Sequence, residues 1–250
     1  MVKVTPRGVL AGLAVLLVAA ACVRLGFWQL GRLEERREGN ARVEAALREP
    51  PVYLDAATAE AVRQDPTLFA HRRALVRGSY LASDPILLRG RFFGGRPGVH
   101  VVAPLKVAGS EQVVLVNRGW FPAPDGARPV EPVPPPPTGS SEARGLLQPV
   151  PRAREGGEPV RHADGTLTRR RLDLEALAGV AGGNLLPLYL QLRPGPVSVN
   201  LPIPVPPPEL DEGPHLSYAV QWFSFALIAL AGFGVVVWRR SQPSPTPPRA

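Results

Sequence analysis

The sequence predicts a membrane protein of the α+β class, in which two transmembrane helices flank a mainly antiparallel β domain, either a sheet or a small barrel. Three observations lead to this fold class. Apolar segments lie near both ends of the 250-residue chain, short segments of alternating apolar residues lie between them, and all 21 acidic residues fall between Gly31 and Pro214. We therefore expect residues 31–214 to form a domain outside the membrane.

Residues 8–30 are expected to form the first transmembrane helix, after a short N-terminal segment, residues 1–7. Val9–Val23 are fifteen residues without a charge, and the apolar character continues beyond Arg24 to Leu30. About 20 apolar residues suffice to span a bilayer. Arg24 would lie near the outer edge, where a long side chain can extend to the interface.

An alternative for the first segment is a lipoprotein signal peptide. The residues Ala19-Ala20-Ala21-Cys22 follow a basic start and an apolar stretch, so Cys22 could be the lipidated residue after cleavage. Against this, the residue three before the cysteine is Ala19, where leucine is usual, and the apolar stretch continues past Cys22. The transmembrane helix is favoured, and the alternative stays open.

The domain at residues 31–214 is predicted to begin with a helix and continue with strands. Leu33–Leu47 is rich in helix formers and either extends the first helix or forms a short second one. The strands are expected from alternating apolar residues. They are Arg73–Tyr80, Ile86–Arg91, Val99–Leu105, Gln112–Gly119, Arg144–Leu147, Leu167–Leu172 and Leu188–Leu192, with a short helix near Leu174–Ala181.

Two proline-rich segments interrupt the predicted strands. Eight of the sixteen residues 122–137 are proline, and residues 194–214 form a second such run. Proline cannot donate a backbone hydrogen bond to a sheet, so both segments are predicted to be extended loops outside it. The turn residues Gly94–Gly98 are expected to connect two strands.

Residues 215–238 are expected to form the second transmembrane helix, followed by a tail, residues 239–250. No charged residue occurs in the 21 positions Tyr218–Trp238, which as a helix measure about 31 Å. Arg239 and Arg240 follow at this end, and Lys3 and Arg7 precede the first helix. Because basic residues flank the cytoplasmic ends of membrane helices, both termini are predicted to be cytoplasmic.

His215 stands immediately before this apolar segment. His215, Tyr218, Trp222 and Phe225 are spaced to share one helix face, which would suit a partner helix or a flat ligand. A plainer interpretation is also open, because tyrosine and tryptophan are common at membrane interfaces and a histidine can cap a helix start.

Charge and composition exclude several classes of function. Residues 31–214 hold 23 of the 29 basic residues and all 21 acidic ones, so the domain nets only +2 of the total +8, which argues against nucleic-acid binding. Cys22 and Met1 are the single cysteine and methionine, which rules out an internal disulfide and disfavours copper transfer. Without a Gly-x-Ser-x-Gly elbow, a phosphate loop or a cysteine pair, no enzyme is predicted. His71, His100 and His162 are expected to be structural or solvated, and Glu209, Asp211 and Glu212 to form a solvated turn.

Four stretches together resemble the Surfeit locus protein 1 family. They are Leu25-Gly26-Phe27-Trp28-Gln29-Leu30-Gly31-Arg32, Arg77-Gly78-Ser79-Tyr80, Val116-Asn117-Arg118-Gly119-Trp120-Phe121-Pro122, and the segment from His215 to Phe223. Members of that family assist assembly of haem–copper cytochrome c oxidases, and bacterial members are associated with haem a. The chain departs from the family pattern at Gly213, where asparagine is common. It also departs after the first-helix motif, where the family usually has a basic residue and this chain has the mixed run Glu34-Glu35-Arg36-Arg37.

The resemblance implies a function and a site. It implies an assembly factor in the bacterial inner membrane, with a periplasmic domain, that binds haem a and helps insert it into oxidase subunit I. Subunit I and haem a synthase are the expected partners; the alternative is a scaffold that holds no cofactor and docks a membrane partner. His215 matches the family's membrane-edge histidine and is the expected ligand of the haem iron. The other expected haem contacts are Tyr218, Trp222, Arg24 and Gln29.

Overall fold

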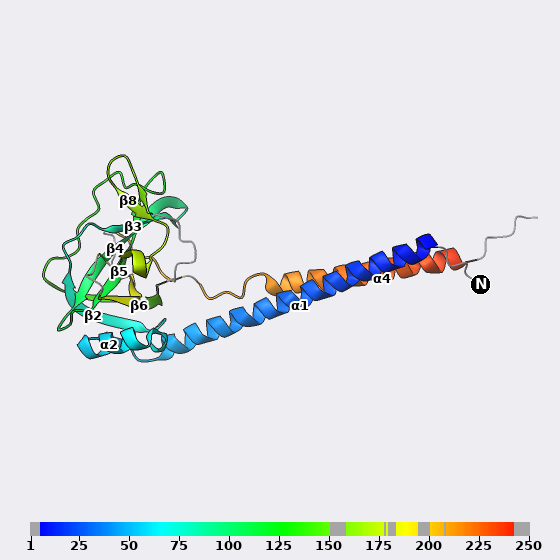
Figure 1. Cartoon of the computed structure of the whole chain (residues 1–250), viewed down its shortest axis with the longest axis horizontal. Coiled ribbons are helices and arrows are strands. Elements are labelled where there is room, and N and C mark those ends of the chain that lie inside the picture. The colour runs from blue at the N-terminus through cyan, green and yellow to red at the C-terminus, as the bar shows by residue number, and fades with distance from the viewer. Residues whose placement is uncertain are drawn as a thin grey trace, which may run out of the picture. The chain divides into compact units, whose positions relative to one another are not determined.

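The computed structural model describes residues 6–150, 159–177, 179, 184–194, 201–207 and 209–242. The chain divides into two units, which Figure 1 traces in colour along the sequence. The first unit, the helix unit, comprises Met1–Arg42 and Leu210–Ala250. The second, the barrel unit, comprises Val43–Glu209.

The helix unit is built on α1 (Pro6–Arg48) and α4 (His215–Ser241). Both helices are long and apolar enough to cross a membrane, and only 11% and 6% of their most apolar windows are buried. A core helix of a water-soluble protein would be mostly covered, so this exposure supports two membrane helices. Leu33–Leu47 is helical throughout and extends α1, as one of the two predicted alternatives required.

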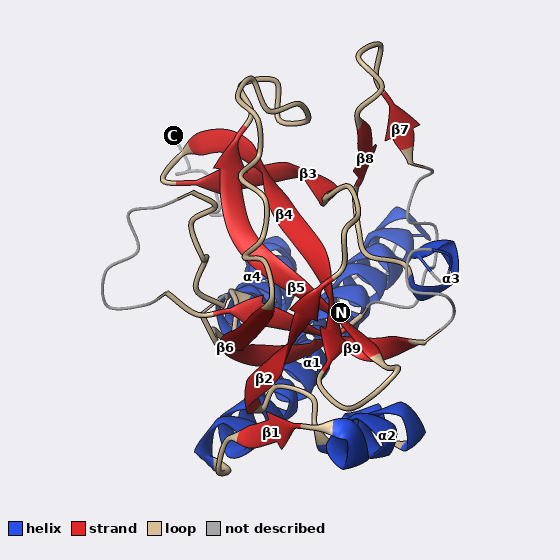
Figure 2. Cartoon of the chain, turned by 90° about the vertical axis from the view of Figure 1, so that its left-hand side faces the viewer, coloured by secondary structure: helices blue, strands red, loops and turns tan. Residues whose placement is uncertain are grey.

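The barrel unit contains a closed five-stranded barrel, so the mainly antiparallel small barrel predicted from the sequence is confirmed (Figure 2). The ring closes because β2 pairs with β6 on one side and with β4 on the other. All neighbours are antiparallel except β5 and β9, which are parallel. In order around the barrel the strands are β2 (Arg73–Tyr80), β6 (Ser140–Pro149), β9 (Leu185–Leu192), β5 (Val113–Pro122) and β4 (Arg96–Val107).

Shorter elements extend the barrel. β3 pairs antiparallel with β4, and β8 pairs parallel with β3. The predicted strand at Leu167–Leu172 is shorter than expected, and the helix begun at Leu174 is described as far as Leu177; Ala178, Val180 and Ala181 lie outside the described residues. The bounds are β1 (Val52–Leu54), α2 (Ala56–Gln64), the 3₁₀ turn η1 (Pro66–Leu68), β3 (Ile86–Phe93), β7 (Val160–Arg161), β8 (Leu167–Arg169) and α3 (Leu174–Leu177).

The main core lies inside the barrel and beneath α2. Val76, Leu105 and Leu190 come from three different strands and are completely buried, as are Ala59 and Val62 of α2. Fully burying one such aliphatic side chain contributes about 1.5–3 kcal/mol. The alternating apolar residues that predicted the strands therefore form the inward faces of the barrel.

Gly78 and Gly119 occupy positions where only glycine fits. A Cβ at Gly78 would lie 2.0 Å from the carbonyl oxygen of Lys106, on the strand that closes the barrel. Gly119 has φ 122, and a Cβ there would lie 2.0 Å from the carbonyl oxygen of Ile203. The glycines in two of the sequence motifs are thus explained by close approaches of backbone to backbone.

The second proline-rich run contributes one residue to the sheet, which corrects the prediction that it stays outside. Trp120 N–H donates to Ile203 O at 2.7 Å, and Ile203 N–H donates to Trp120 O at 2.8 Å. The physical reason is that Ile203, between Pro202 and Pro204, keeps the backbone donor that its neighbours lack. Of the first proline-rich run, 122–137, Pro122 ends β5 and pairs with Gly98, whereas residues 123–137 contain no strand, as predicted.

Candidate functional site

Small residues line the contact between α1 and α4. The buried residues of each helix are three, four or seven positions apart, a spacing that keeps them on one face of the helix. Small side chains let two helices approach closely, which is how membrane helices commonly associate. The small buried residues are Ala19, Cys22 and Gly26 on α1, and Ala219 and Ala226 on α4; the larger Leu33 of α1 is also buried.

Two glycines of α1 receive aromatic rings of α4. A Cβ at Gly26 would lie 2.6 Å from the ring of Phe223, and one at Gly12 would lie 3.2 Å from Phe233. Phe223 also meets Phe27 edge-to-face, with ring centroids 5.4 Å apart. These contacts fix the two helices antiparallel and set their register along each other (Figure 1).

The same register brings His215 to Gln29, 186 positions earlier in the chain. His215 Nδ1 lies 2.8 Å from Gln29 Oε1. Because an amide oxygen only accepts, Nδ1 carries the proton and donates it. In the neutral ring this tautomer leaves the lone pair on Nε2 free to bind a metal.

His215 does not act as the cap of α4. The N-cap position is Pro214, with no side-chain capping bond, and the hydroxyl of Ser217 donates to Pro214 O at 2.8 Å. Gly213, with φ 67, stands where the family commonly has asparagine, and a Cβ there would lie 3.6 Å from His215 Nε2. Gln29 therefore orients the imidazole, and the missing asparagine does not leave it unsupported.

An ion pair holds the chain just before α4. Arg37 of α1 donates to both carboxylate oxygens of Glu212, at 2.9 and 3.0 Å. Asn40 adds a bond to the carbonyl oxygen of Asp211 at 2.9 Å. The hydrogen bonds from Arg37 lower the pKa of Glu212. The predicted solvated turn is therefore tied to α1, through residues that the sequence pattern did not single out for this role.

The aromatic residues of α4 divide between two environments. Trp222 is half-buried against the small residues of the helix contact and meets Phe225 edge-to-face at 5.9 Å. Tyr218 and Phe225 are 45% and 44% exposed. The four residues expected on one helix face therefore have different surroundings. His215 and Trp222 turn toward α1, whereas Tyr218 and Phe225 lie at the exposed side of the helix contact.

Arg24 is not brought to His215. It lies midway between Cys22 and Gly26, which are buried against α4, and at 3.6 residues per turn this places Arg24 on the opposite face of α1. Its side chain is exposed, and no partner for it occurs in the part of the chain that the structure describes. The geometry gives no support to the expected contact between Arg24 and a ligand held at His215.

The barrel histidines bind other protein groups. His162 Nε2 lies 2.9 Å from Thr168 Oγ1, and His100 Nδ1 lies 3.3 Å from Asn117 Nδ2. His71 adopts φ 63 in the turn before β2. Within the described ranges, no three His, Cys, Asp or Glu side chains are grouped as metal ligands would be.

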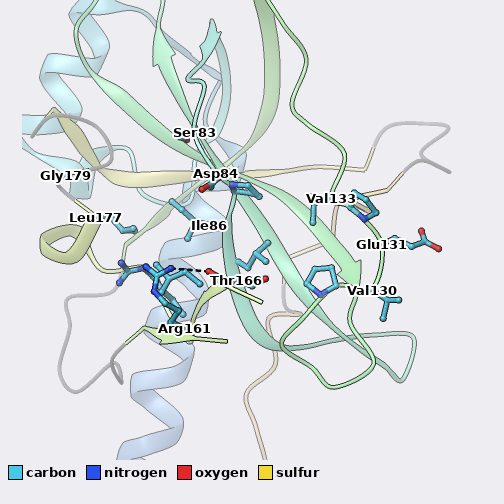
Figure 3. A pocket seen from close by; sticks show the side chains of 17 residues that line it. Ser83, Asp84, Ile86, Val130, Glu131, Val133, Arg161, Thr166, Leu177 and Gly179 are labelled. Atoms are coloured by element: carbon cyan, nitrogen blue, oxygen red, sulfur yellow. Dashed lines mark hydrogen bonds between the residues drawn. The ribbon is translucent and has the colours of Figure 1, made fainter. Parts of the chain in front are cut away.

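A cavity of about 890 Å³ lies beside the first proline-rich segment (Figure 3). Ile86 and Leu177 lie on one side of it, and the proline-rich segment with Val130, Glu131 and Val133 lines the other side. Val130 is 79% exposed. The polar groups of this cavity come from different segments and do not converge on one point, so the cavity is not assigned a small ligand.

The fold and the helix contact define a class of protein: two helices suited to a membrane, joined through a β-barrel domain. Within that class, a model of the SURF1 family matches residues 16–227, and the chain belongs to this family. An uncharacterized SURF1-like protein of Mycobacterium tuberculosis is 30% identical over 249 residues, covering 94% of this chain and 89% of the relative. A SURF1-like protein of Rickettsia felis is 34% identical over 111 residues, 44% of this chain and 45% of that protein.

Proposed function

We propose that this chain is an assembly factor for haem–copper cytochrome c oxidase, which binds haem a at His215 and helps insert it into subunit I. The proposal draws on the membership of the SURF1 family and on one observation. His215 donates through Nδ1 to Gln29 at 2.8 Å, so Nε2 is the nitrogen left for iron. A histidine imidazole is a common axial ligand of haem.

The residues around His215 fit a haem group. Gln29 would accept a hydrogen bond from the ligating imidazole and so fix the tautomer and orientation of the ring, as hydrogen-bond partners of metal-binding histidines do. Tyr218, Phe27 and Trp28 are 45%, 63% and 57% exposed on this helix pair and offer apolar surface to a porphyrin. When bound, haem supplies the iron that an imidazole ligates and a flat apolar ring that aromatic side chains cover.

The number of ligands suits a carrier that must release its cargo. Of the four histidines in the sequence, His215 alone belongs to the helix unit, and the single methionine is Met1. One protein imidazole holds iron less firmly than two would. A site built on His215 alone can therefore pass haem on to a protein that offers a second ligand.

Haem loading tests the proposal. Wild-type protein purified from cells that make haem a should show a Soret band, and His215→Ala should lose at least tenfold in loading. Gln29→Leu keeps His215 but removes its acceptor, so we expect loading to fall by about ten- to a hundredfold. Ser217→Ala is the matched control, because the hydroxyl of Ser217 donates to Pro214 in the same helical turn, and it should load like wild type.

The competing function is a scaffold that docks subunit I or another membrane partner without a cofactor. Wild-type protein that stays colourless but co-purifies with subunit I would favour the scaffold and end the haem proposal. Our proposal also includes contact with haem a synthase, as the source of the cofactor. It places the barrel in the periplasm and both termini in the cytoplasm. A reporter that works only in the cytoplasm should therefore be active when it is fused after Arg240.

A further inference from the structure

A second cavity, of about 280 Å³, lies within the barrel unit and is lined by hydrogen-bond donors. Its polar lining residues are Arg91, His100, Asn117, Arg171, Tyr189 and Gln191. They come from β3, β4, β5, β9 and the segment after β8. The lining contains two arginines and no carboxylate.

A β-bulge turns Arg91 toward this cavity. Leu88 and Arg91 both line it although they are three positions apart, whereas residues three apart in a regular strand face opposite sides. The pairing of β3 with β4 shifts between these two residues, and Gly90 has φ 73 there. Bulges that redirect one side chain are common next to binding sites.

Arg91 has an unused donor in this position. Its Nη2 donates to the carbonyl oxygen of Arg170 at 2.8 Å, but its Nε is buried without a partner. Burial, reinforced by the neighbouring charge of Arg171, lowers the pKa of Arg91. Neither arginine has an ion-pair partner in the described part of the chain. Two cations that share a partly buried cavity repel each other unless an anion lies between them.

His100 adds a further donor. Gly119 N–H donates to Asn117 Oδ1 at 3.1 Å, which turns the amide nitrogen of Asn117 toward His100 Nδ1 at 3.3 Å. Nδ1 therefore accepts, and in the neutral ring the proton is carried by Nε2. Burial, with a smaller contribution from Arg91, lowers the pKa of His100 to about 4, so the ring is neutral at pH 7.

We propose that this cavity binds the phosphate or carboxylate group of a small soluble molecule, held by Arg91, Arg171 and His100. Arginine pairs with such oxyanions through several parallel N–H donors, and the orphaned Nε of Arg91 is one of them. A cavity of about 280 Å³ is slightly smaller than the sites that hold drug-sized molecules, so it suits an anion of few atoms. The inference does not depend on haem binding.

The test uses the full chain in nonionic detergent at constant ionic strength. Inorganic phosphate or succinate should raise the unfolding midpoint above that in chloride, since a ligand that binds only the folded state stabilises it. Broadening of the phosphorus-31 signal of phosphate should report direct binding. Arg91→Met and Arg171→Met should each weaken binding at least tenfold. Arg77→Met, which changes an exposed arginine paired with Glu142, should bind like wild type.

Several results would overturn the inference. The first is wild-type protein that responds equally to phosphate, succinate and chloride, a result that needs no variant to fold. Arg91→Lys keeps the charge but loses Nε, and unchanged binding in this variant and in Arg171→Met would also refute it. A response to phosphatidylglycerol in mixed micelles but not to phosphate would exclude a soluble ligand.

Discussion

Arg37 and Glu212 form a two-point ion pair across 175 positions of sequence, with N–O distances of 2.9 and 3.0 Å. Glu212 lies three residues before His215, and Arg37 lies two helical turns after Gln29. The pair therefore fixes where α4 starts against α1, and with it the contact between His215 and Gln29.

Reversing one charge of this pair should weaken the site. With Arg37→Glu we expect haem loading to fall by about two- to fivefold, a modest effect because both side chains are exposed. The double variant Arg37→Glu/Glu212→Arg should restore it, and loading can be followed by the Soret band. High salt should reproduce the single variant. If the double variant stays as weak as Arg37→Glu, the pair does not set the register.

The ion pair also has a defined pH range. Arg37 lowers the pKa of Glu212, so the stabilisation is fully present above the ordinary glutamate pKa and is lost as pH falls through the lowered one. Near neutral pH the pair is fully formed, so its contribution to loading should not change with pH there. Comparison of wild type with Glu212→Gln above and below that range checks the assignment, since the two should converge only in acid.

Adding one methyl group at Gly26 should disturb the helix contact. The Cβ would meet the ring of Phe223 at 2.6 Å, so we expect Gly26→Ala to destabilise the helix pair by about 1–3 kcal/mol. Gly31→Ala is the control, because nothing lies within 4 Å of a Cβ there and alanine is the better helix former. Unfolding in mixed micelles measures both. Equal stability of the two variants would contradict the close contact.

Gly119→Ala, in strand β5, should be more damaging than a glycine-to-alanine change in an open turn. It combines φ 122 with a Cβ 2.0 Å from Ile203 O, so we expect a loss of about 3 kcal/mol or more. Gly109 also has positive φ, 72, but open space around its Cβ, and Gly109→Ala should cost only about 1–2 kcal/mol. Thermal unfolding of the two variants should rank them in this order.

His100 should make the barrel sensitive to acid. Its pKa is about 4 in the folded protein, below that of an ordinary histidine, so the unfolded chain binds a proton that the folded one excludes. Stability should therefore fall as pH drops from about 6.5 to 4, by an amount on the order of 3 kcal/mol. His100→Gln should flatten this part of the profile. An unchanged slope would show that other groups cause it.

Most of the barrel could be predicted because each strand carries its own pattern. Arg73–Tyr80 was predicted with the bounds that β2 has, since its alternation is local. Val52–Leu54 and Val160–Arg161 were missed, because three or two residues are too short to show a period. Helix α2 had a signal that was overlooked: Asp55 caps it and accepts from Thr58 N–H at 2.8 Å.

The site was predicted only in part. The motifs pointed to His215 and Gln29, but their contact depends on how two helices rotate against each other, and that is decided by packing. The small residues Ala19, Cys22 and Gly26 follow a heptad spacing and could have identified the contact face. The same face places Arg24 on the far side of α1, which composition and membrane depth alone could not reveal.

The contact between Gln29 and His215 joins the two long helices through residues 186 positions apart in the sequence. The ribosome synthesises α1 first and α4 last, so the small-residue face of α1 has no partner helix until the whole barrel has been synthesised. A message truncated anywhere before codon 215 yields a protein with a complete barrel at best and no imidazole at the membrane edge. Termination anywhere before codon 215 should then abolish the proposed haem loading, even where the barrel is complete.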